Sequence, residues 1–110
     1  MRKALKLEDE ANFILKGLSD PGALLCVVDR AGHTNVMAIG WGLVGRSYRS
    51  NPIMVVAVCP PRYSWRMLEE CEDFVVAVGG PELRPAVQFC GSHSGRDVED
   101  KFQKARLTPI

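Results

Sequence analysis

The stretch from residue 35 to residue 42, Asn-Val-Met-Ala-Ile-Gly-Trp-Gly, constrains the possible fold of this chain more than any other. Its composition predicts a β-strand, in which successive side chains point to opposite faces. Met37, Ile39, Trp41 and, just beyond the stretch, Leu43 fall on one face, which we expect to pack against a core. The other face carries Val36, Ala38 and two glycines, and glycine inside a strand often marks the close approach of a ligand or of another backbone. A bulge or a tight bend in a barrel strand would explain the same glycines, so both interpretations stay open.

Hydrophobic periodicity predicts the other elements of the chain. We expect strands over residues 23–28, 34–44, 53–59 and 74–78, and helices over residues 5–18, 63–70, 82–89 and 98–105. The first two strands are joined too tightly for a crossover helix, so they form a hairpin and the sheet is mostly antiparallel. The run at 53–59 is almost continuously apolar, which is typical of a strand covered on both faces.

These elements predict a mainly β (α+β) fold with short peripheral helices. About four strands make an open sheet with exposed edges. We therefore expect residues 1–110 to form a single domain that is the N-terminal portion of a larger one, or whose sheet a partner completes. Residues 1–20 would carry its N-terminal helix.

Composition excludes several classes of function. The net charge is +1 and the basic residues are dispersed among acidic ones, which argues against nucleic acid or an anionic membrane as the main partner. No apolar run is long enough to span a bilayer, and the N-terminus lacks the apolar stretch of a signal peptide. We expect a cytoplasmic protein.

The four cysteines show no spacing typical of a zinc site, so we expect free thiols and no metal. Cys26 and Cys59 stand in apolar runs and should be buried and unreactive. Cys90 precedes a loop of glycine and serine, so we expect it to be the accessible thiol. A redox role there would need an electropositive setting.

Two loops that follow strands offer a candidate anion site. Residues 45–52 and 59–64 should lie near each other at one rim of the sheet. Together they supply the arginines, hydroxyl groups and helix N-terminus that phosphate sites use: Arg46, Arg49, Arg62, Tyr63 and Ser64. The alternative is that Ser64 only caps a helix and the arginines are solvated.

The loop at residues 91–97 is polar and contains two glycines, so it could close over a ligand. Within it, His93 is a candidate acid–base group or a solvent-exposed side chain, and Asp97 could instead cap the next helix. The chain has no nucleophile elbow, zinc-protease or Walker motif. Residues 40–45 match the letters of the dinucleotide fingerprint, but no helix follows them, so we reject that fold.

In this order, three stretches resemble the flavin reductase-like, FMN-binding split-barrel family, particularly its flavoredoxin-type branch. They are Asn-Val-Met-Ala-Ile-Gly-Trp at 35–41, Pro-Arg-Tyr-Ser at 61–64, and the run at 90–102 that contains Ser-Gly-Arg-Asp and ends in Lys-Phe. The resemblance covers most of the chain from about Gly22 onward. It implies an antiparallel Greek-key split barrel of roughly six strands, usually a homodimer with FMN near the subunit interface. Members generally extend beyond this C-terminus, so the last strands would be missing here.

The resemblance also implies a set of cofactor-binding residues. Asn35, Val36, Met37 and Ala38 would line the edge of the flavin ring, largely through backbone groups. Arg62, Tyr63 and Ser64 would hold the phosphate or the ribityl chain, and Ser94, Gly95 and Lys101 would belong to the loop that closes the site.

The implied activity is that of an FMN-binding oxidoreductase, a flavin reductase or flavoredoxin-like electron carrier. Hydride would pass from NAD(P)H to the bound flavin and no catalytic side chain would be needed. The alternative is a non-catalytic, truncated split-barrel module that binds flavin weakly or assembles with a partner.

Overall fold

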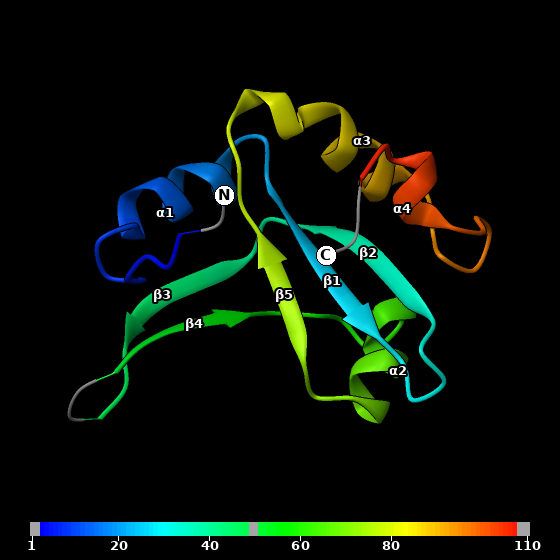
Figure 1. The fold of residues 1–110 in the computed structure, drawn as a ribbon, viewed down its shortest axis with the longest axis horizontal. Coiled ribbons are helices and arrows are strands. Elements are labelled where there is room, and N and C mark those ends of the chain that lie inside the picture. Colours follow the sequence, from blue (N-terminus) through cyan, green and yellow to red (C-terminus); the bar gives the residue numbers. More distant parts are fainter. Residues whose placement is uncertain (1–2, 49–50, 108–110) are drawn as a thin grey trace.

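The computed structural model describes residues 3–48 and 51–107. Within them it forms two antiparallel sheets and several short helices (Figure 1). A three-stranded sheet has the order β2-β1-β5, and a two-stranded ribbon pairs β3 with β4. In chain order the elements are α1 (Ala11–Ser19), β1 (Ala23–Val28), β2 (Thr34–Ile39), β3 (Gly42–Arg46), β4 (Pro52–Val56), α2 (Tyr63–Glu70), β5 (Phe74–Ala77), the 3₁₀ helix η1 (Pro81–Leu83), α3 (Arg84–Ser92) and α4 (Lys101–Lys104).

The hairpin predicted from the sequence is confirmed, since β1 pairs antiparallel with β2 along its whole length. The turn is held by Asp29, whose carboxylate accepts hydrogen bonds from the backbone N–H of His33 (2.8 Å) and contacts its Nδ1 (2.9 Å). Gly32 has a φ of +91° there, a conformation that side chains disfavour. The short connection therefore folds back as its composition indicates.

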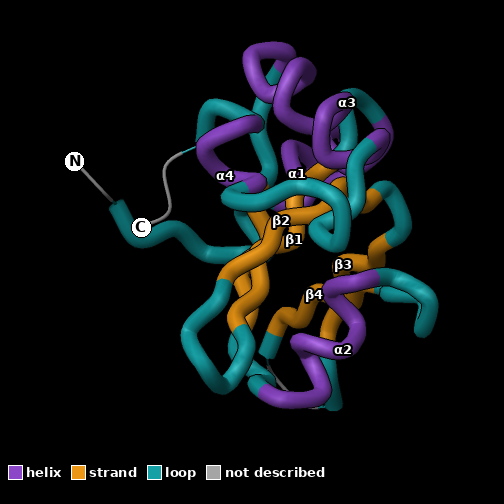
Figure 2. Tube along the Cα trace, turned by 90° about the vertical axis from the view of Figure 1, so that its right-hand side faces the viewer, coloured by secondary structure: helices purple, strands orange, loops and turns teal. Residues whose placement is uncertain are grey.

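The three-stranded sheet divides the core into two layers. Leu24 of β1 faces a cluster formed with α3 and α4, whereas Leu25 faces the other way, toward α1, α2 and the β3–β4 ribbon. Figure 2 shows α3 and α4 on one side of the strands and α2 on the other. Alternation along β1 thus places one apolar row in each layer, as the period of a strand requires.

The prediction of one continuous strand over residues 34–44 is wrong. The segment divides at Gly40 and Trp41 into β2 and β3, which belong to different sheets. Of the large face expected to pack in a core, Ile39 is buried but Trp41 is 60% exposed and Leu43 58%. Glycine permits the bend between the sheets, and beyond the bend these side chains no longer point toward the first sheet.

The strand expected over residues 53–59 is also shorter, ending at Val56, and only one of its faces is covered. Met54 and Val56 pack toward the core while Val55 on the opposite face is 45% exposed. Its apolar composition indicated cover on both faces, but the two-stranded ribbon supplies a core on one side only. The described residues form no closed barrel, so the Greek-key barrel remains a prediction.

The helices agree with the sequence pattern to different degrees. The prediction for α2 is correct at both ends. Helix α1 begins at Ala11 rather than Leu5, which stays exposed and has no core to pack against. Residues 82–89 fall within η1 and α3 together, and of residues 98–105 only α4 is helical.

Candidate functional site

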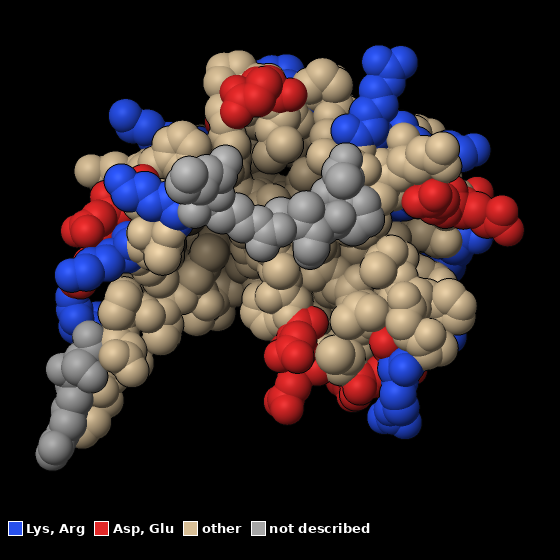
Figure 3. All heavy atoms as spheres, viewed as in Figure 1, with Lys and Arg blue, Asp and Glu red and all other residues tan. Residues whose placement is uncertain are grey.

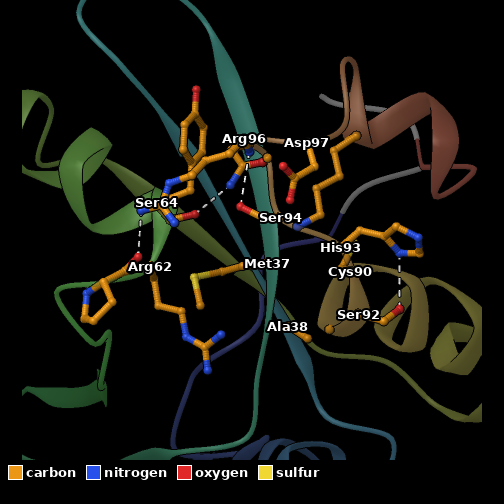
Figure 4. Close-up of a pocket in the computed structure, with 16 residues that line it drawn as sticks. Met37, Ala38, Arg62, Ser64, Cys90, Ser92, His93, Ser94, Arg96 and Asp97 are labelled. Atoms are coloured by element: carbon orange, nitrogen blue, oxygen red, sulfur yellow. Dashed lines mark hydrogen bonds between the residues drawn. The ribbon is translucent and has the colours of Figure 1, made fainter.

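A polar cavity of about 370 Å³ lies beside β2, between the start of α2 and the segment from the end of α3 to α4 (Figure 4). Strand β2 is at the edge of its sheet, so within the described residues its outer side has no strand partner. Asn35 and Met37 face one layer of the core and Ala38 the other. The cavity therefore borders both faces of the sheet beside an edge where backbone groups remain available for hydrogen bonds.

Nine of the ten residues predicted to bind a cofactor line this cavity. They are Asn35, Met37, Ala38, Arg62, Tyr63, Ser64, Ser94, Gly95 and Lys101. The tenth, Val36, is fully buried in the cluster formed with α3 and α4, so its side chain does not reach the cavity. Three segments far apart in the sequence thus meet at one place. Their contacts with a flavin stay a prediction.

A buried hydrogen bond fixes one wall of the cavity. The side-chain amide of Asn35 donates to the hydroxyl of Ser64 over 2.8 Å, and both side chains are buried. The expectation that Ser64 caps α2 is wrong: Arg62 is the N-cap, and no side chain caps that helix. The hydroxyl is instead used to satisfy an amide that would otherwise be buried without a partner, which is costly.

The loop after α3 packs closely on the same wall. A Cβ atom added to Gly95 would lie 2.5 Å from Asn35 Oδ1 and 2.7 Å from Tyr63 Cδ2, distances that real Cβ atoms do not adopt. The neighbouring Arg96 donates to the carbonyl of Pro61 over 2.7 Å and lies 6.0 Å from the centre of the Tyr63 ring. The loop is therefore attached to the start of α2 on the opposite side of the cavity.

Lys101 is the most deeply buried charged side chain at the site. It is only 4% exposed and has neither a hydrogen bond nor a carboxylate within ion-pair distance among the described residues. Among those residues, every fully buried side-chain nitrogen or oxygen atom has a hydrogen-bond partner. The ammonium of Lys101 has none, so it is not fully buried and reaches the cavity that the residue lines. Burial lowers the pKa of Lys101, and the nearby Cys90 opposes this by a smaller amount.

Cys90 is not the accessible thiol that the sequence suggested. Helix α3 continues to Ser92, so Cys90 lies on its inner face and is 4% exposed. Burial raises the pKa of its thiol despite the neighbouring Lys101, which makes it a poor nucleophile. The prediction that Cys59 is buried is wrong, because β4 ends at Val56 and leaves this thiol exposed. Cys26 is half-buried, and burial raises its pKa.

Arg46, which the sequence predicted for the anion site, does not join it. Arg46 lies at the end of β3 and pairs with Glu8 over 2.8 Å, away from the cavity lining. Arg49 lies outside the described residues. The segment that joins β3 to β4 was expected near the start of α2, but the ends of β3 and β4 that lead into it point away from α2, toward the other side of the molecule (Figure 1).

His93 and Asp97, for which the sequence left two alternative roles each, both line the cavity. His93 is exposed and stacks on Phe89, with ring centres 4.2 Å apart and Nδ1 3.0 Å from the Phe89 carbonyl. Asp97 does not cap α4, because Asp100 is the N-cap and accepts from the backbone N–H of Gln103.

Sequence reasoning had not assigned Pro61, Gly91, Ser92 and Arg96 to the site, although they line the cavity. All of them belong to the stretches that carried the family resemblance, and their proximity in the chain to predicted residues was the available signal. Within residues 3–48 and 51–107, no group of three or more histidine, cysteine, aspartate or glutamate side chains could hold a metal ion. In the same residues no helix is long and apolar enough to cross a membrane.

Comparison with known proteins finds no matching family model. An uncharacterized protein of Archaeoglobus fulgidus is 36% identical over 84 residues, which are 76% of this chain and 46% of that protein. The chain spans about half the length of the relatives it matches.

Two solved structures share the architecture. Flavoredoxin of Desulfovibrio vulgaris (Miyazaki F) has a TM-score of 0.71 at 28% identity, covering 82% of this chain and 48% of the flavoredoxin. An FMN-binding domain of a flavin reductases-like enzyme from Shewanella baltica has a TM-score of 0.74 at 19% identity, covering 98% of this chain and 53% of that domain. The chain therefore has the flavin reductase-like, FMN-binding fold.

Proposed function

We propose that this chain, which has the flavin reductase-like fold, binds FMN in the cavity beside β2 and serves as a flavin reductase or a flavoredoxin-like electron carrier. The observation that carries the proposal is the meeting of three distant segments, those at 35–38, 61–64 and 90–101, around one cavity. Its volume of about 370 Å³ lies in the range of pockets that hold small organic ligands.

The residues present fit such a cofactor. The free edge of β2 offers backbone donors and acceptors for the rim of a flat heterocycle. Met37 and Ala38 supply an apolar surface on that edge, and the charged lining is mainly cationic, as a phosphate-bearing ligand requires. Val36 would contribute only through its backbone, since its side chain belongs to the core.

When bound, FMN supplies the redox chemistry by accepting hydride from NAD(P)H and passing electrons on. The chain's own residues would bind and orient it. Residues 35–38 would hold the ring edge, and Arg62, Tyr63 and Ser64 would face the ribityl phosphate. Ser94, Gly95 and Lys101 would close the cavity from the other side. We propose a homodimer acting in the cytoplasm, with a small-molecule or protein electron acceptor.

The test is a visible absorption spectrum of the purified protein after incubation with FMN and removal of free ligand, together with its mass in solution. We expect flavin to be retained on a dimer and then bleached by NADH or NADPH without oxygen. A colourless protein would contradict FMN binding. Retained flavin that neither nucleotide reduces would contradict only the reductase activity.

A second candidate function, assembly with a partner without catalysis, is favoured by an apolar groove of about 390 Å³ between β4, α2 and β5. The groove is lined mainly by side chains that the core leaves partly uncovered, including Met54, Val56, Leu68 and Phe74. Strands β4 and β5, which border it, each have an outer edge without a strand partner among the described residues. A flavin-free protein that forms stable oligomers would support this function over the first.

A further inference from the structure

The apolar groove between β4, α2 and β5 lies apart from the cavity beside β2 and shares no lining residue with it. Residues 54–56 of β4 all line the groove, although neighbouring side chains of a strand point to opposite faces. The groove therefore follows the edge of β4 and not one of its faces. Its other sides are formed mainly by Trp65 and Leu68 of α2, Phe74 of β5 and Leu25 of β1.

The edge of β4 that borders the groove is free to receive another strand. Among the described residues, β4 pairs only with β3, and β5 pairs only with β1. Proteins protect open edges with charged residues or with proline inside the strand. The five residues of β4 include no charge and have proline only at the first position, and the four residues of β5 have neither. Both edges therefore lack the features that discourage pairing with another chain.

The comparisons indicate that folds of this kind contain more chain than residues 1–110. The chain corresponds to 48% of the flavoredoxin and 53% of the FMN-binding domain, while 82% and 98% of its own residues are matched. About half of each solved chain therefore has no counterpart here. A β-strand from such a further segment fits an open edge next to apolar side chains, since it pairs the backbone groups and buries alternate side chains.

The charge of the groove indicates the chemistry of one end of that strand. Glu69 is the only charged residue among those that line the groove. The chain continues from there with Glu70, Glu72 and Asp73, which are all exposed. This acidic end would attract a basic residue of the incoming strand, because complementary charges steer association and fix the orientation of the partner.

We propose that the groove binds an extended β-strand from outside residues 1–110, which pairs with the open edge of β4. Alternate apolar side chains of that strand would pack against Leu68 and Phe74, and a basic residue at one end would lie near Glu69. Backbone hydrogen bonds would supply the affinity, and the alternate side chains the specificity. This inference does not depend on flavin binding. It rests on the second candidate function, assembly, and names the partner.

The test measures binding of a synthetic peptide to the 110-residue protein by fluorescence anisotropy. The peptide has about nine residues, with valine at every second position, threonine between the valines and lysine at both ends. We expect saturable binding, and a peptide that fails to bind would overturn the proposal. Replacing the central threonine and the valine beside it by proline should weaken binding about fivefold or more, because donors are lost from both edges of the peptide strand. Exchanging both lysines for glutamate should weaken it about threefold.

Two neighbouring residues of β5 provide a matched pair of variants. Phe74 lines the groove, whereas Val75 points to the opposite face of the strand and is 61% exposed. Phe74→Thr should weaken peptide binding about fivefold, since it removes apolar contact area, and Val75→Thr should leave it unchanged. Threonine suits a strand, so both variants should keep the fold. Equal affinities of Phe74→Thr and the wild type would overturn the proposal.

Hydrogen exchange locates the peptide on the protein. Amides of residues 53–56 should exchange more slowly once the peptide is bound, because those on the open edge gain hydrogen-bond partners, whereas amides of α3 should not change. Slow exchange at residues 53–56 in a dimer before any peptide is added would show that a second copy fills the groove, and would overturn the proposal.

The outcome is separate from that of the proposed function, because no flavin takes part. A protein that retains no FMN and binds the peptide supports this inference while flavin binding fails. A protein that retains FMN and does not bind the peptide overturns this inference alone.

Discussion

At the scale of single residues, the Asn35–Ser64 hydrogen bond joins β2 to the start of α2 and so fixes one wall of the cavity. We predict that Ser64→Ala lowers the free energy of unfolding by about 1–3 kcal/mol, because the buried amide of Asn35 loses its acceptor. Urea unfolding measures the change. Ser92→Ala is the matched control, since its hydroxyl bonds backbone carbonyls at the exposed end of α3, and should change stability by less than about 0.5 kcal/mol. Equal losses in the two variants would contradict the role of the buried pair.

The reactivity of the four thiols tests, again at the scale of single residues, which cysteines the fold leaves exposed. We predict that Cys59 reacts first with a disulfide reagent at pH 8, because it is exposed, and that Cys59→Ser removes the fast phase. Cys26 and Cys90 should react slowly, since burial raises the pKa of both and leaves less thiolate at that pH. Their reaction should accelerate as the pH rises toward those pKa values. A fast phase that survives in Cys59→Ser but is lost in Cys90→Ser would show that the region around Cys90 opens.

The sequence allowed most of the site's residue types to be anticipated but not how each side chain is used. The family resemblance predicted that residues 35–38, 61–64 and 94–101 share one site. A local sequence motif does not show which hydrogen bonds each of these side chains makes. Whether Ser64 caps a helix or meets Asn35 depends on the approach of two segments 29 residues apart. The burial of Cys90 likewise depends on where α3 ends relative to β2.

At the scale of elements, sequence patterns predicted correctly those helices and strands whose formation depends on residues close together in the chain. The β1–β2 hairpin and helix α2 follow from turn chemistry and apolar spacing, which act over a few residues. The division of residues 34–44 into two strands did not follow, because both halves have strand composition. Only packing in two separate sheets distinguishes them.

The loop between α3 and α4 lines one side of the cavity, and we propose that it closes the site over the ligand. We predict that Gly95→Ala weakens FMN binding at least fivefold, because the added methyl would overlap Asn35 and Tyr63 and displace the loop. Equilibrium titration with FMN measures this. Gly91→Ala is the matched control at the same cavity, since its added carbon would make an ordinary 3.5 Å contact with Ala38. If both variants bind FMN as the wild type does, the loop does not close the site.

At the scale of the whole molecule, the sheet is open and its apolar surface is unequally covered. The helices α3 and α4 cover one layer, whereas the outer face of the β3–β4 ribbon has no cover among the described residues. Leu43 and Val55 are directly paired across that ribbon, and Ile53 lies beside Val55 on the same face, all of them exposed. In the view of Figure 3 the lower part of this arm is uncharged, while basic side chains gather along its left edge.

A contiguous apolar face of this kind marks a contact surface in soluble proteins, and we predict that it mediates self-association. Val55→Lys places a charge at the centre of the face, where it would be desolvated in any contact, so the variant should sediment as a monomer at concentrations where the wild type forms dimers. Phe13→Lys, which adds the same charge at an equally exposed apolar position on α1, is the control and should leave the dimer intact. If Val55→Lys keeps the wild-type mass, the ribbon is not the contact surface, and the apolar groove between β4 and β5 becomes the next surface to test by the same substitution at Phe74.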